Sequence, residues 1–108
     1  MSIKLSDLLQ DIITNKVDTK SASSMLDEET KKMLVGWYLQ YSDNKKADIQ
    51  IVLHLLGFLY YKQDIDMTDP SVYLKTIDYL SEEYYINRET FFSMLSDFRK
   101  MVYYTKNV

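Results

Sequence analysis

The chain has 108 residues, the size of one domain, with 46% hydrophobic residues and a formal net charge of −3 at pH 7. It has no cysteine, which excludes thiolate catalysis, disulfide bonds and cysteine-bound zinc. Two glycines and one proline are too few for a turn-rich fold, while 14% aromatic residues argue against disorder. We therefore predict a single all-α domain over residues 1–108, a compact bundle of four to five helices.

The first predicted helix covers residues 6–15, with Ser6 as its N-cap. Its apolar residues follow the three-four spacing of one helical face: Leu5, Leu8, Leu9, Ile12 and Ile13. Polar residues at Asp7 and Asp11 interrupt the apolar stretch that a signal peptide requires, which predicts a cytoplasmic protein. The next segment, 15–24, has small polar residues and no periodicity, so we predict a flexible linker there.

A second helix is predicted after Asp27, whose carboxylate can cap it. The third, over about 45–62, contains a run from Ile49 to Tyr61 in which only Gln50, His54 and Gly57 are not apolar. A helix needs about 20 apolar residues to cross a bilayer, and this run is shorter. We therefore expect no membrane contact. A helix that is apolar nearly all round belongs in the middle of a protein. The third helix is therefore predicted to be the central one.

The fourth helix is predicted to begin after the cap Asp69, with Pro70 in the first helical position. A short break over residues 85–87 ends it, and Asn87 caps the fifth helix. Phe92 lies outside the apolar stripe of this last helix, which consists of Phe91, Met94, Leu95, Phe98, Met101 and Val102.

Catalytic motifs are absent from the sequence. His54 is the single histidine, and no acidic residue lies four positions before or after it. The two glycines are too far apart for a phosphate-binding loop, and no glycines flank a serine as in a nucleophile elbow. We expect a protein that is not an enzyme, with no catalytic residue, cofactor, metal ion or small-molecule substrate.

Ten tyrosines are the most unusual feature, and many occur in aromatic doublets near helix ends. Adjacent residues on a helix point about 100° apart, so one member of each doublet is expected at the surface. Exposed aromatic residues often dominate protein-binding surfaces. The leading hypothesis is a surface that binds and modulates another cytoplasmic protein, or a second copy of the chain. Its predicted contacts are Tyr84, Tyr85, Phe92, Tyr103 and Tyr104.

A helix-turn-helix DNA-binding regulator is the alternative, built from the fourth and fifth helices. Ser81 and Phe91 fit its pattern, but Tyr85 occupies the glycine position of the turn and would need a left-handed conformation. Residues 86–108 carry four basic and two acidic side chains, whereas residues 1–85 carry nine basic and fourteen acidic ones. The residues that would face DNA are Arg88, Ser93, Ser96, Arg99 and Lys100.

Two further hypotheses concern the source of the gene and the class of the protein. The abundance of Lys, Ile, Tyr, Asn and Asp is typical of an A/T-rich genome, which favours a low-GC bacterium or one of its phages or plasmids. The small size and helical plan also fit a bacteriocin-immunity-type protein. A toxin gene beside this one in the genome would favour that assignment.

Overall fold

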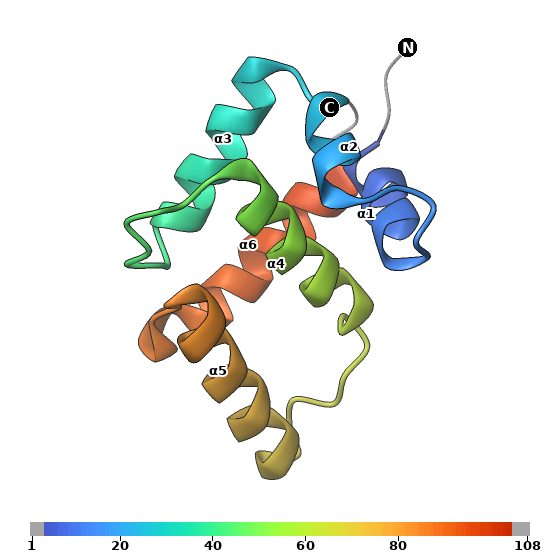
Figure 1. Cartoon of the computed structure of the whole chain (residues 1–108). Coiled ribbons are helices and arrows are strands. Elements are labelled where there is room, and N and C mark those ends of the chain that lie inside the picture. Colours follow the sequence, from blue (N-terminus) through green and yellow to red (C-terminus); the bar gives the residue numbers. More distant parts are fainter. Residues whose placement is uncertain (1–3, 105–108) are drawn as a thin grey trace.

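The computed structural model describes residues 4–104, except for the side chain of Tyr104. This part of the chain is helical, without strands, and confirms the all-α prediction (Figure 1). Within it, six α-helices and one 3-10 turn follow one another: α1 (Leu5–Ile13), α2 (Thr19–Ser24), α3 (Glu28–Leu39), α4 (Ile49–Tyr61), α5 (Pro70–Tyr84), η1 (Arg88–Thr90) and α6 (Phe91–Tyr104).

Helix α4 lies at the centre of the fold, as the apolar run predicts. It contacts α1, α2 and α3, and α6 passes behind it in Figure 1. Its buried residues point in several directions around the cylinder: Val52, Leu53, Leu55, Leu56, Gly57 and Leu59. The helix begins later than predicted, at Ile49, because Asp48 caps it by accepting a hydrogen bond of 2.9 Å from the Ile51 N–H. None of the helices within residues 4–104 has the length and apolar character needed to cross a bilayer.

The polar strip of α4 is partly open to solvent and partly covered. Gln50, His54 and Tyr61 are exposed, whereas Gly57 is buried against α1. A Cβ atom at Gly57 would lie 3.5 Å from the Ile12 Cγ2 atom, so a small residue lets the two helices approach closely.

The predicted linker over 15–24 is wrong for most of its length, because residues 19–24 form α2. Asp18 caps this helix, accepting a hydrogen bond of 2.6 Å from the Ser21 N–H, and Ala22 is fully buried. The Thr19 hydroxyl and the His54 Nε2 atom lie 3.0 Å apart and tie α2 to α4. A helix of six residues is too short to show the three-four periodicity that reveals longer helices.

The start of α1 also differs from the prediction. The helix begins at Leu5 after the cap residue Lys4, which makes no side-chain capping bond, and Ser6 therefore lies inside the helix. Both later caps are confirmed. Asp69 accepts a hydrogen bond of 2.9 Å from the Ser71 N–H, and Asn87 accepts one of 2.9 Å from the Glu89 N–H.

The turn between α5 and α6 is held by the end of α3. Tyr85 adopts the left-handed conformation, with φ 56° and ψ 33°, as its place in the turn requires. The Tyr38 hydroxyl donates a hydrogen bond of 2.7 Å to the Tyr84 carbonyl, and the Ser42 hydroxyl donates a second. The Asn87 N–H donates to the Tyr41 carbonyl at 2.9 Å. These bonds satisfy backbone groups that a helix end would otherwise leave unpaired.

A phenol–carboxylate contact links the segment after α3 to α6. Tyr41 is buried, and its hydroxyl donates a hydrogen bond to the Asp97 carboxylate. Burial, together with the hydrogen bond to Asp97, raises the pKa of Tyr41 from 10.0 to about 12. The proton is therefore held more tightly in the folded chain than in the unfolded chain.

The pKa of Tyr41 is higher in the folded chain than in the unfolded chain, so the protonated phenol stabilises the fold. This stabilisation is complete below pH 10 and is lost between pH 10 and about 12. We expect the free energy of unfolding to fall between about pH 9 and pH 11, and to fall less in Tyr41→Phe. Chemical denaturation at the two pH values measures the free energy of unfolding of the native chain and of Tyr41→Phe. Equal losses in the two proteins would contradict the coupling of Tyr41 to folding.

Candidate functional site

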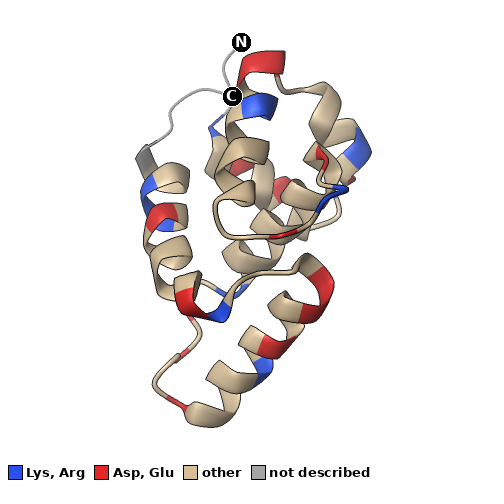
Figure 2. Ribbon diagram, turned by 90° about the vertical axis from the view of Figure 1, so that its left-hand side faces the viewer, with Lys and Arg blue, Asp and Glu red and all other residues tan. Residues whose placement is uncertain are grey.

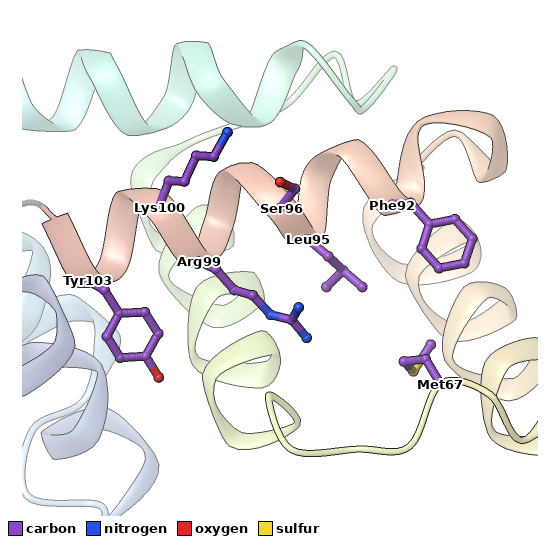
Figure 3. Close-up of a pocket in the computed structure, with 7 residues that line it drawn as sticks. All are labelled: Met67, Phe92, Leu95, Ser96, Arg99, Lys100 and Tyr103. Atoms are coloured by element: carbon purple, nitrogen blue, oxygen red, sulfur yellow. The ribbon is translucent and has the colours of Figure 1, made fainter.

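A groove runs along the outer face of α6 and is the candidate site (Figure 3). Its volume is about 560 Å³. Residues 62–69 connect α4 to α5 and supply one of the lining side chains, while α6 supplies the others. We call this surface the α6 groove, and its lining residues are Met67, Phe92, Leu95, Ser96, Arg99, Lys100 and Tyr103.

The sequence of α6 places these residues on one side by helical spacing. Positions 92, 95, 96, 99, 100 and 103 repeat at intervals of three and four, which brings them to one face. The opposite face is buried in the core through Phe91, Met94, Phe98 and Val102. In Figure 3 the side chains of Phe92, Leu95, Arg99 and Tyr103 project to the same side of the helix as Met67. Those of Ser96 and Lys100 project to the other side of the helix. Helix α6 therefore packs into the core with one face and lines the groove with the other.

Aromatic residues stand at both ends of the groove and are exposed yet held in place. Phe92 is 60% exposed and stacks on Tyr73 of α5, with ring centroids 5.5 Å apart and ring planes 17° apart. Tyr103 is 58% exposed, and its hydroxyl donates a hydrogen bond to the Gln63 side-chain oxygen. A side chain already held by such contacts loses less conformational freedom on binding.

A small pit adjoins the groove. Its volume is about 20 Å³, room for a single methyl group or one water molecule. It shares Met67, Leu95 and Arg99 with the groove. Phe91 and Phe98 form part of its wall, so the pit is mostly apolar.

Arg99 and Lys100 give the groove its charge. No acidic residue lines it, and neither side chain forms an ion pair within residues 4–104. Asp97 of the same helix is engaged elsewhere, since its carboxylate accepts the Tyr41 hydrogen bond. Figure 2 shows that acidic positions predominate along α5. The groove is thus a basic site on a chain with net negative charge.

The predicted protein-binding residues do not form one surface. Phe92 and Tyr103 line the groove, whereas exposed Tyr85 lies beside a shallow depression formed by the α5–α6 turn. Tyr84 is only 8% exposed, so its prediction as a surface contact is wrong. Its ring packs in the core because position 84 continues the buried stripe of Ile77 and Leu80. The predicted contact of the Tyr104 side chain lies outside the described part of the structure.

The predicted DNA-facing residues are also divided. Ser96, Arg99 and Lys100 line the groove, and Ser93 is exposed but outside the lining. Arg88 lies near the turn, where its guanidinium forms an ion pair of 2.7 Å with Asp78. Two groove residues were missing from both predicted sets. Met67 comes from a loop without periodicity, and Leu95 belonged to the predicted core stripe although it is only half-buried.

Within residues 4–104 no group of three or more His, Cys, Asp or Glu side chains could hold a metal ion. The chain matches no protein-family model, no curated protein and no solved structure to a significant degree. The geometry of the α6 groove is therefore the main support for a functional proposal.

Proposed function

We propose that the protein is a non-enzymatic binding protein that holds and modulates another protein in the α6 groove. The observation that carries this proposal is the pair of exposed aromatic rings, Phe92 and Tyr103, held by their neighbours at opposite ends of one apolar-floored groove. Exposed, pre-positioned aromatic side chains around an apolar centre are typical of binding hot spots.

The packing supports the same proposal. Phe92 contributes nothing to the buried stripe of α6, and its ring lies against a neighbour while most of its surface meets solvent. A large apolar ring in that position gains little stability from the fold alone, because hydrophobic stabilisation scales with the area removed from water. A partner that covers the groove would bury this area.

The double variant Phe92→Ala/Tyr103→Ala tests the proposal. We expect it to lose at least about 2 kcal/mol of partner binding, roughly a thirtyfold loss in affinity, because both aromatic anchors are removed. The measurement is capture of partner proteins by the tagged chain from a lysate of its source organism, followed by titration of the captured protein.

The matched control is Tyr61→Ala/Tyr85→Ala, which removes two exposed tyrosines outside the groove. It should keep capture, and both variants should keep the helical circular dichroism signal. Undiminished capture by the groove variant, or an equal loss in the control, would contradict the assignment of this surface.

DNA binding is the second candidate function, and one observation favours it. The left-handed Tyr85 makes a tight turn between α5 and α6, as in a helix-turn-helix. The pairing of Arg88 with Asp78 weighs against it, since that arginine is already neutralised. A gel-shift titration of duplex DNA at about 50 and 200 mM salt separates the two functions, because phosphate contacts make binding strongly salt-dependent.

A further inference from the structure

We infer that the occupant of the α6 groove is an amphipathic helix of another protein that carries carboxylates over Arg99 and Lys100. This inference rests on the binding function proposed above. Phe92 and Tyr103 lie about three helical turns apart, or roughly 16 Å along the α6 axis. A partner helix of similar length would contact both rings and the apolar floor between them.

Charge complementarity identifies the acidic character of the occupant. Arg99 and Lys100 are exposed, and the lining of the groove contains no acidic residue. A covering partner would remove water from these two cations, and a buried cation without a counter-charge is unfavourable. Carboxylates on the partner would supply that counter-charge.

A second copy of the chain that docks through its own α6 groove is a poor occupant for the same reason. Two α6 helices packed antiparallel face to face would pair Phe92 with Tyr103, Leu95 with Lys100 and Ser96 with Arg99. Four cations would then meet in the middle of the interface, without an acidic residue among the lining residues to balance them. Like charges in such positions oppose association.

Nucleic acid is disfavoured by the loop on the other side of the groove. Met67 lies in the same loop as Asp64 and Asp66, both exposed. A uniform polyanion would meet these carboxylates as well as Arg99 and Lys100. A helix can place its acidic residues near the two cations and its apolar residues over Met67 and Phe92.

The pit sets a further requirement on the apolar side of the partner. Its volume of about 20 Å³ suits one methyl group, and its walls include Leu59 and Phe98. A small aliphatic side chain on the partner helix could enter it, whereas an aromatic ring could not. The occupant therefore carries an aliphatic anchor on its apolar face and carboxylates beside it.

A library of displayed random peptides, about 16 residues long or some four helical turns, tests the inference. The full chain is the target, with Arg99→Gln/Lys100→Gln and Phe92→Ala/Tyr103→Ala as comparison targets. We expect peptides selected by the native chain to be enriched in Asp and Glu, with aliphatic residues at three-four spacing. Single selected peptides should lose roughly tenfold in affinity for Arg99→Gln/Lys100→Gln.

Selected peptides without acidic enrichment, whose binding still needs Phe92 and Tyr103, would overturn the acidic occupant but leave the proposed function standing. Peptides that bind equally to Phe92→Ala/Tyr103→Ala would overturn both. Displacement of the selected peptides by a short DNA duplex would overturn the inference in favour of nucleic acid. Concentration-dependent dimerisation of the native chain that Phe92→Ala abolishes would overturn it in favour of a second copy.

Discussion

Replacing Leu56 by alanine should lower the free energy of unfolding by about 2–5 kcal/mol. Leu56 is fully buried on α4, the helix that α1, α2 and α3 contact. The substitution removes apolar area and leaves a cavity that a close-packed interior only partly fills. Because small domains are stable by only about 5–15 kcal/mol, this loss is a large share of the total. Urea denaturation followed by far-UV circular dichroism measures it.

The matched control is Leu39→Ala, the same chemical change at a helix position that is 48% exposed. It should change the free energy of unfolding by less than about 1 kcal/mol, since little area returns to solvent and no closed cavity forms. If Leu56→Ala were no more destabilising than Leu39→Ala, α4 would not be the enclosed centre of this domain.

The second large effect is expected on the inner face of α6. Phe98 is fully buried, and Phe98→Ala should lower the free energy of unfolding by about 3–5 kcal/mol. Phe92→Ala on the same helix removes a mostly exposed ring, its stacking on Tyr73 and its contact with Phe91. An aromatic pair of this kind is worth about 0.5–1.5 kcal/mol. Denaturation curves of the two single variants give the comparison directly.

The pair also separates stability from binding. Phe92→Ala should stay folded at the temperature of a binding assay and bind poorly. Phe98→Ala, which also changes a wall of the pit, should be the less stable of the two variants. The opposite ranking, with Phe92→Ala the less stable variant, would mean that the outer ring belongs to the core and that the groove is misassigned.

The central helix and the later caps could be predicted because each depends on local physics. A run apolar on nearly all sides has no favourable position except the interior, and this placed α4. Asp69 with Pro70, and Asn87, satisfy helix starts through their own side chains and backbone geometry. Helix α2 could not be predicted, because this short polar segment is helical only through its packing on α4. No local sequence pattern encodes that packing.

The site was predictable only in part. Phe92 was found because it lies outside the apolar stripe of its helix, a signal that the sequence contains. Tyr84 was misplaced although its three-four spacing to Leu80 and Ile77 already indicated the core. Met67 could not be predicted, since it reaches the groove from a loop whose course depends on how α4 and α5 pack.

The hydrogen bonds from the end of α3 to the α5–α6 turn have a consequence for the order of assembly. The Tyr38 and Ser42 hydroxyls reach the Tyr84 carbonyl across sequence separations of 46 and 42 residues. During synthesis the two donor residues leave the ribosome before the Tyr85 turn does. The turn can therefore form its hydrogen bonds with a segment that has already been synthesised. The turn between the last two helices is therefore stabilised by an earlier part of the chain, and a fragment that lacks residues 38–42 would lose the donors that hold it.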